Sequence, residues 1–375
     1  MTAEPVVRSA IATSILHGMP VLPLYGHSTL RDRLRAAVAQ GTLPSSLLFQ
    51  GPRGIGKQQL ALWVARVLLC ENADRAPCGD CRACRMAGKL QHPDLHWFFP
   101  RPRPKDSALD ADAAREDMAE AIVERMNNGG IYEAPGGDEG IFISTTHALT
   151  RAAAMAPAMG RRKVFIVGDA DRMVAQEGTE QAANAFLKLL EEPPANTTVM
   201  LTSSEPGALL PTIRSRVVSI RVAPLSDDEV RAFLADPTVA NQLDLGSAAR
   251  TEELVGLAGG APGHLIGREA WDTALGQARR ILDAAAAPDR GTRMRVALAQ
   301  GGFGARGKFS DTLDALTMLL HERSRSAATR GNTAEAFGAA RAVAVVEETK
   351  ELASGNVNPQ LLTASLLRHL SAVPR

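Results

Sequence analysis

A glycine-rich segment that ends in a lysine is the first part of the sequence whose residue types could do chemistry. Gly51, Gly54, Gly56 and Lys57 lie in the spacing Gly-x-x-x-x-Gly-Lys, which is typical of a phosphate-binding loop. In such a loop, backbone amides face the phosphate oxygens, the lysine contacts the β- and γ-phosphates, and the next helix N-terminus adds positive potential. We therefore predict a phosphate loop here; the alternative is a glycine-rich turn that binds nothing.

The residues that would hold a magnesium ion beside this loop depart from the usual pattern. A Ser or Thr normally follows the lysine as a Mg²⁺ ligand, and here that residue is Gln58. An Asp followed by Glu normally ends a nearby buried strand, where the pair orients the metal and the attacking water; here Gly168 and Asp169 stand there, followed by Ala170. Treated as two independent losses, these changes predict a degenerate site without hydrolysis. The loop could still bind ATP or ADP weakly or persist only as structure.

The four cysteines of the chain form a second candidate site. They lie within fifteen residues in the pattern Cys-x7-Cys-x2-Cys-x2-Cys, as Cys70, Cys78, Cys81 and Cys84. Zn²⁺ prefers four thiolates in a tetrahedron, and a set without an open position is structural and not catalytic. We predict a structural zinc site, with an iron–sulfur cluster or unliganded buried cysteines as alternatives. His92 and His96 follow closely, but the thiolates already complete the site, so we expect both to be surface or packing residues.

Two arginines form a third candidate site. Arg214 and Arg216 lie on a predicted short helical turn, just before a predicted strand. Charged residues of this kind are usually solvated. An arginine at the edge of a subunit can instead reach the γ-phosphate bound by its neighbour and stabilise the transition state of hydrolysis. The spacing leaves both interpretations open.

The elements that must position these residues alternate between strands and helices. Apolar runs predict buried strands at 45–50, 163–167, 199–202 and 217–222. Apolar residues at helical spacing predict one helix over 60–68 and a second over 182–190, which Pro193-Pro194 ends. Strand, glycine loop and helix form the first unit of a doubly wound sheet. We therefore predict an α/β domain with a parallel sheet.

The remaining segments differ in composition. The stretch from about 100 to 140 has Pro and Gly near its ends and a predicted polar helix between, so we expect a partly mobile surface insertion outside the sheet. After Pro224, Ser226 and Glu229 have the spacing of a capping box that opens a small helical unit. From about Thr273 onward every segment is predicted to be helical.

Composition sets limits on function. The formal net charge is +1, with 42 basic and 41 acidic residues, which excludes a strongly basic nucleic-acid-binding protein. Any DNA contact would depend mainly on other chains. We find no signal-peptide layout and no uninterrupted apolar run of about 18 residues. We therefore expect no membrane segment and a reducing cytoplasm, where clustered cysteines favour metal over disulfides.

Taken in order, these motifs resemble the clamp-loader AAA+ family of bacterial DNA polymerase III. The likeness covers about residues 22–270, with a weaker cue at Asn356-x-Asn358-Pro359. Besides the phosphate loop and the cysteine module, it rests on His92-Pro93-Asp94, the strand 163–167, Leu187-Lys188-Leu189-Leu190-Glu191-Glu192-Pro193-Pro194 and Ile213-Arg214-Ser215-Arg216. The resemblance implies an α/β AAA+ P-loop domain, a small helical lid and an all-α collar.

Two kinds of subunit share these blocks in that family. The tau and gamma motor subunits keep the Lys-Ser/Thr and Asp-Glu pairs, whereas the delta-prime subunit commonly does not hydrolyse ATP and offers an arginine finger to the adjacent motor. Gln58 and Gly168 depart from the motor pattern, and so does Gly263, where motors carry a lid arginine. The family's Ser-Arg-Cys triplet reads Ser-Arg-Val here, which retains Arg216 as the implied finger. These features favour the delta-prime type.

The resemblance also implies a domain division and a set of partners. The division is an N-terminal extension 1–23, an AAA+ domain 24–223 with the zinc module 70–84 and the insertion at about 100–140, a lid 224–272 and a collar 273–375. The implied partners are tau or gamma and delta in a pentameric clamp loader, the sliding clamp, and primed DNA through the assembly. The chain would thus be part of the DNA polymerase III holoenzyme. The alternatives are an active motor-type ATPase that uses Asp169 and Gln58 in altered roles, and a zinc scaffold unrelated to replication.

Overall fold

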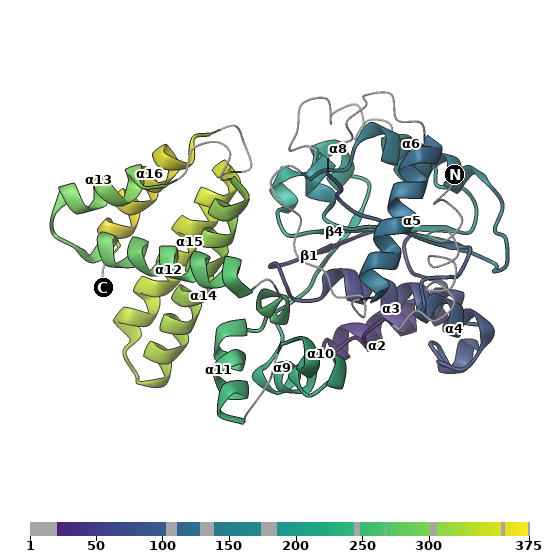
Figure 1. The fold of residues 1–375 in the computed structure, drawn as a ribbon, viewed down its shortest axis with the longest axis horizontal. Coiled ribbons are helices and arrows are strands. Elements are labelled where there is room, and N and C mark those ends of the chain that lie inside the picture. Colours follow the sequence, from purple (N-terminus) through teal and green to yellow (C-terminus); the bar gives the residue numbers. More distant parts are fainter. Residues whose placement is uncertain are drawn as a thin grey trace, which may run out of the picture.

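The computed structural model describes residues 21–102, 111–127, 139–173, 186–243, 248–266, 268–300, 306–353 and 357–373. These residues form a sheet with helices around it, a group of small helices, and a bundle of longer helices (Figure 1). Each of the three parts has its own cluster of buried apolar side chains. Within the described residues, no helix has the length and apolar character needed to cross a membrane.

The sheet contains five parallel strands in the order β2-β3-β4-β1-β5. The strands are β1 (Ser46–Gln50), β2 (Leu95–Phe98), β3 (Lys163–Val167), β4 (Thr197–Ser203) and β5 (Val218–Arg221). The three central strands, β3, β4 and β1, are buried along nearly their whole length, as expected for parallel strands covered on both faces. The predicted parallel α/β sheet is confirmed. The strand predicted to be buried at 217–222 is instead the largely exposed edge strand β5, because it pairs with β1 on one side only. The edge strand β2 is an addition that the apolar runs did not predict.

The candidate nucleotide site forms where the carboxyl ends of the strands lie, which we call the sheet edge. The phosphate loop follows β1, Gly168 follows β3, and Ser204 follows β4. β1 pairs with β4, and β4 pairs with β3. Because parallel strands end at the same edge of a sheet, these three segments lie next to one another.

Helices cover both faces of the sheet. They are α2 (Ser28–Ala39), α3 (Lys57–Leu69), α4 (Arg82–Gly88), α5 (Ala111–Asn127), α6 (Ile143–Ala154) and α8 (Pro211–Arg214). The predicted apolar face of α3, which includes Leu60, Trp63 and Val64, is buried against the sheet. Of the second predicted helix, residues 186–191 are helical and its earlier residues, including Ala182 and Ala183, lie outside the described part.

The segment predicted as an insertion contributes one long helix. Helix α5 matches the predicted polar helix and buries Ala114, Met118 and Ala121. At its end, the Arg125 guanidinium lies 3.1 Å from the centroid of the Phe99 ring, which follows β2. Arg101 and Gly140 pair through an isolated antiparallel bridge. Residues 103–110 and 128–138 of this segment lie outside the described part.

The small helices follow the sheet in the chain. They are α9 (Asp227–Leu234), α10 (Pro237–Gln242) and α11 (Ala248–Ala258). The predicted capping box is present, because the Ser226 side chain accepts a hydrogen bond from the Glu229 amide while Glu229 accepts one from the Ser226 amide. Val230, Leu254 and Leu265 belong to the apolar cluster of this part.

The C-terminal part is a bundle of five helices in the described residues. They are α12 (Arg268–Ala286), α13 (Arg290–Leu298), α14 (Arg306–Thr329), α15 (Thr333–Ala353) and α16 (Pro359–Ala372). Asn358 caps α16 by accepting a hydrogen bond from the Gln360 amide, and Pro359 is the first helical residue, a position that proline favours. This arrangement explains the Asn-Pro pair; Asn356 lies outside the described part.

Candidate functional site

The phosphate loop joins β1 to α3 in a conformation that depends on glycine. Gly54 and Gly56 have φ angles of +75° and +88°, in the left-handed region that residues with a Cβ rarely adopt. Gly56 immediately precedes α3. The loop therefore ends at the N-terminus of a helix, as its sequence predicted.

The side chain of Lys57 binds the protein's own loop. Its ammonium group donates hydrogen bonds to the carbonyl oxygens of Gly51 (2.9 Å) and Pro52 (2.8 Å) and to the Ser204 hydroxyl (2.8 Å). An ammonium group has three protons, so these acceptors use all of them. Burial lowers the pKa of Lys57 to about 8, although Asp169 and Asp171 favour its charged form.

Gln58 fills the place where a magnesium ligand would be expected. Its amide nitrogen donates to Asp169 Oδ2 at 2.9 Å, and its amide oxygen accepts from Trp97 Nε1 at 2.9 Å. A Cβ atom added to Gly168 would lie 2.4 Å from the Gln58 Oε1 atom, far inside a van der Waals contact. The amide N–H directed at Asp169 would repel a cation, so these residues do not fit Mg²⁺.

The two changes at this site are therefore coupled and not independent. Gln58 can reach Trp97 and Asp169 only because residue 168 has no side chain. The sequence predicted two separate losses of metal ligands. The structure corrects this: the longer side chain occupies the space that the glycine leaves.

Gly263 lies directly against the phosphate loop. Its backbone N–H donates to the Gly54 carbonyl oxygen at 2.9 Å, and a Cβ atom added to Gly263 would lie 2.6 Å from Gly54 Cα. The next residue, His264, stacks on Trp271 of α12 with ring centroids 3.6 Å apart. The close backbone contact leaves no room for a side chain at residue 263.

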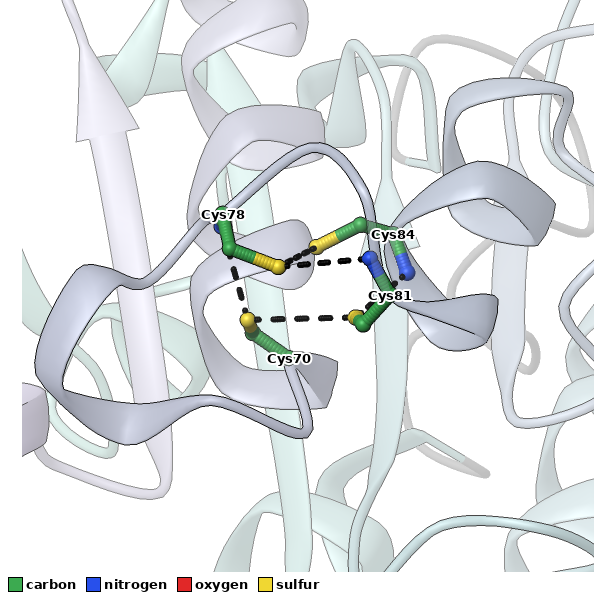
Figure 2. A group of neighbouring side chains, drawn as sticks. All are labelled: Cys70, Cys78, Cys81 and Cys84. Carbon is green, nitrogen blue, oxygen red and sulfur yellow. Dashed lines mark hydrogen bonds between the residues drawn. The ribbon is translucent and has the colours of Figure 1, made fainter.

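The four cysteines meet beside the N-terminus of α4. Their sulfur atoms all lie within 4.8 Å of one another, and Figure 2 shows the four side chains converging on one point. The Cys70–Cys81 and Cys78–Cys84 sulfur pairs are each 4.0 Å apart. A tetrahedron with Zn–S bonds of about 2.3 Å has edges of roughly 3.8 Å. The set therefore has the chemistry and spacing of a four-thiolate metal centre.

Backbone amides favour the thiolate form of Cys81, whereas burial raises the pKa of Cys84 and a hydrogen bond with the Asp80 side chain raises the pKa of Cys78. Cys81 precedes α4, and its sulfur accepts a hydrogen bond from the Cys84 amide. Burial opposes ionisation of Cys81, but backbone amides outweigh it and lower its pKa to about 7. The two nearby histidines lie elsewhere: His92 Nδ1 accepts from the Asp94 amide at 3.1 Å, and His96 stacks on Phe165.

Arg216 lies just after the short helix α8, with 32% of its side chain exposed. Its Nε donates to Glu191 Oε1 at 2.9 Å, and Nη2 forms an ion pair with the same oxygen. Nη1 donates to the Thr212 carbonyl oxygen at 2.9 Å and to the Ser215 hydroxyl at 3.1 Å. The guanidinium group therefore binds residues of its own chain and lies at the surface. It is far along the sequence from the phosphate loop.

Two residues of the site were missed by the sequence interpretation. Trp97 binds Gln58 from the unpredicted strand β2, and Arg53 of the phosphate loop forms ion pairs with α14. An arginine inside a phosphate loop is a visible signal. Its partners in α14 are more than 250 residues away in the chain, so no local pattern could identify them.

Comparison with known proteins identifies the family. The family described as DNA polymerase III, delta subunit, matches residues 26–226. A DNA polymerase III subunit delta' from Pseudomonas aeruginosa is 32% identical over 216 residues, which are 57% of this chain and 52% of that protein. The Escherichia coli subunit delta' is 30% identical over 233 residues, 62% of this chain and 56% of that protein.

A gamma/tau relative is similar to a comparable degree. The gamma/tau subunit from Mycobacterium tuberculosis is 32% identical over 211 residues, 56% of this chain and 30% of that protein. The chain spans about half the length of the two delta' relatives that it matches. The matched family covers more than half of this chain and carries the phosphate loop, the cysteines and Arg216. The chain therefore belongs to the DNA polymerase III delta-subunit family, the clamp-loader family that its motifs resemble.

Proposed function

We propose that this chain is a delta-prime-like subunit of the clamp loader that does not hydrolyse ATP itself. In this proposal residues 24–223 form the AAA+ domain, 224–272 the lid and 273–375 the collar, after an N-terminal extension 1–23. The chain supplies Arg216 to the ATP site of an adjacent tau or gamma subunit. With delta it supports loading of the sliding clamp on primed DNA, which the assembly contacts.

The position of Gln58 carries this proposal. Hydrolysis in a phosphate-loop protein needs Mg²⁺ held between the loop and the strand-end carboxylate. Here the Gln58 amide bridges that gap and donates to Asp169, while Lys57 binds backbone carbonyl oxygens and Ser204. Ala170 offers no group that could polarise a water molecule. Turnover at this loop would require several buried contacts to rearrange together.

The surroundings of Arg216 support a role toward another subunit. A finger acts on a neighbour's nucleotide, so it must lie at the surface, and Arg216 does. Arg216 can leave Glu191 for another anion at a small cost in free energy, because exposed ion pairs contribute only about 0–1 kcal/mol to stability. A γ-phosphate carries more charge than one carboxylate and can replace Glu191 without loss.

Zinc is the proposed structural cofactor of residues 70–84. When bound, it would cross-link four side chains of a loop and a short helix that have few apolar contacts of their own. Cys70, Cys78, Cys81 and Cys84 would hold it, with no position open for a substrate.

The first test is ATPase activity in a reconstituted mixture. This protein, a tau or gamma subunit, delta, the clamp and primed DNA are combined with wild-type chain or with Arg216→Ala. We expect no ATP hydrolysis by this protein alone. In the mixture, Arg216→Ala should lower the rate of hydrolysis at the neighbouring site that this chain completes by roughly 10³-fold or more. Arg231→Ala is the matched control, because Arg231 is also an exposed arginine paired with carboxylates.

The second candidate function is a motor-type ATPase, which the likeness to gamma/tau subunits favours. Strong Mg²⁺-dependent turnover by this protein alone, abolished by Lys57→Ala, would establish it and overturn the proposal. If Arg216→Ala prevents assembly, as judged by gel filtration of the mixture, Arg216 is a structural residue and not a finger.

A further inference from the structure

The phosphate loop makes contacts that a nucleotide site does not require. Arg53, between the loop glycines, has only 12% of its side chain exposed. Its Nη1 atom donates to Asp311 Oδ1 at 2.8 Å, its Nε atom lies 3.9 Å from Asp314 Oδ2, and its Nη2 atom lies 3.7 Å from Glu205 Oε1. Asp311 and Asp314 belong to α14 of the C-terminal bundle. One cation of the loop is thus held by three carboxylates from two parts of the molecule.

The carboxylates around Arg53 are themselves linked across the same boundary. Ser310 of α14 donates to Glu205 Oε1 at 2.5 Å, and Glu205 follows β4 of the sheet. Lys350 of α15 lies 2.9 Å from Asp314. Three carboxylates and two cations, all at most 29% exposed, therefore connect the sheet edge to two helices of the bundle.

These pairs differ from ordinary surface ion pairs. Exposed pairs contribute little because water screens them, but a pair removed from water cannot lose one partner without leaving an unpaired charge. Burial disfavours the Arg53 cation, yet Asp314, Asp311 and Glu205 raise its pKa above the ordinary value. Burial also opposes ionisation of Asp314, but Lys350 and Arg53 lower its pKa. For Asp311 burial outweighs the Arg53 cation, and with Asp314 acting in the same direction the pKa of this carboxyl group is raised. The ionisation of each group in the cluster thus depends on its neighbours.

Neighbouring residues of the phosphate loop also form hydrogen bonds with groups of the protein itself. Gly54 accepts a hydrogen bond from Gly263, and Lys57 binds Gly51, Pro52 and Ser204. Both cations of the loop and the carbonyl oxygens of Gly51, Pro52 and Gly54 are therefore bound to other groups of the protein. The anionic oxygens that Arg53 contacts come from Asp311 and Asp314 of α14 and from Glu205, which follows β4.

We propose that the phosphate loop of this chain is a binding site for its own C-terminal bundle, with the Asp311 and Asp314 carboxylates of α14 as the ligand of Arg53. The loop holds the bundle against the sheet edge in one orientation, and this contact is independent of nucleotide. The proposal concerns contacts within the chain, so it stands apart from the role of Arg216.

Hydrogen exchange of the zinc-loaded full-length chain tests this inference. Arg53→Met is compared with wild type in peptides that contain residues 51–57 and the first turns of α14. We expect exchange there to become roughly a hundredfold faster, because removing one partner leaves buried carboxylates unpaired. Arg231→Met, which breaks an exposed pair within the small helices, should change the same peptides by less than about fivefold.

A milder variant covers the case in which Arg53→Met does not fold. Asp311→Asn keeps the shape of its side chain and weakens the same contact, and it should speed exchange in both peptides at once. The double variant should exchange little faster than Arg53→Met alone, since both changes break one contact. Additive effects, or wild-type exchange at α14 in either variant, would overturn the proposal. Faster exchange at α14 on adding Mg-ATP to wild type would also overturn it, because the contact would then respond to nucleotide.

Discussion

At the scale of single residues, Gln58 and Gly168 fit together as one unit. The Gln58 side chain bridges Trp97 and Asp169, and it passes through the space that a side chain at residue 168 would need. A chain that gained only one of these changes would suffer either a steric clash or a void. The pair therefore explains why a lost metal ligand and a lost strand-end carboxylate occur together.

This coupling predicts that the loss of folding stability caused by a side chain at residue 168 depends on which residue stands at position 58. Gly168→Ala should destabilise the wild-type fold by about 1–3 kcal/mol, because the new Cβ overlaps the Gln58 amide. In a Gln58→Ser background the same substitution should cost less than about 0.5 kcal/mol. Urea unfolding of the four zinc-loaded proteins measures both values. Equal costs in the two backgrounds would show that residues 58 and 168 act separately.

The residue types of the site could be predicted from the sequence, but their contacts could not. The phosphate loop, the missing hydroxyl at Gln58 and the four cysteines are local patterns with known chemistry. The partners of Lys57 and Gln58 depend on how strands distant in sequence end at one sheet edge. For example, Ser204 is 147 positions from Lys57. Periodicity carries no information on such a pairing.

At the scale of elements, the predictions succeeded where a segment is fully buried or explicitly capped. The central strands are short apolar runs, and α9 begins at a capping box. The edge strand β2 has only four residues, Leu95–Phe98, with His96 among them, so it lacks a continuous apolar pattern. Helix α2 buries only Leu34 fully and gives a similarly weak signal.

The cysteine module, residues 70–84, is the element whose proposed zinc ion can be tested most directly. Helix α4 has seven residues, too few to be stable alone. Cys70, Cys78 and Cys81 precede the helix, and Cys84 lies in its first turn. We expect about one zinc ion per chain by elemental analysis, and loss of that ion in Cys81→Ser. Chelation should speed hydrogen exchange in residues 70–88 before it affects the bundle, because the bound ion stabilises such sites by on the order of 10 kcal/mol.

Arg82→Ala provides the matched control for this prediction. Arg82 is exposed and follows Cys81 directly, but it offers no ligand. It should keep the full zinc content and wild-type exchange. Iron with a visible absorption band in the purified protein would contradict the zinc assignment. If Arg82→Ala loses the ion as readily as Cys81→Ser, the cysteine sulfurs are not the ligands that hold it.

At the scale of the whole molecule, the junction between the sheet and the bundle contains a half-buried histidine whose two ring nitrogens are shielded from solvent. His264 lies next to Gly263, which contacts the phosphate loop, and it stacks on Trp271 at the start of the bundle. Burial lowers the pKa of His264 to about 4, with Arg53 and Lys57 acting in the same direction and Asp314 opposing them. Its ordinary pKa is 6.5. The junction therefore holds this histidine neutral.

A neutral histidine with shielded ring nitrogens makes the molecule sensitive to acid. Between pH 6.5 and about 4 the unfolded chain binds a proton at His264 that the folded chain does not, so the free energy of unfolding must fall as the pH is lowered through this range. The full effect is up to about 3 kcal/mol for this group. His96, whose pKa burial and Lys163 also lower to about 4, adds to it. Urea unfolding at several pH values between 4 and 7 measures the slope.

His264→Phe separates the junction from other sources of acid sensitivity. Phenylalanine can stack on Trp271 but cannot take up a proton, so the variant should lose a smaller amount of stability between pH 6.5 and 4 than wild type. His147→Phe is the control, because His147 is exposed on α6 and remote from the junction. If the wild-type slope persists in His264→Phe, the acid response arises elsewhere. If the slope falls, protonation acts at the point where phosphate loop, small helices and bundle meet. Acid should then loosen the bundle from the sheet edge before either part unfolds, which hydrogen exchange at α14 and at β1 would resolve.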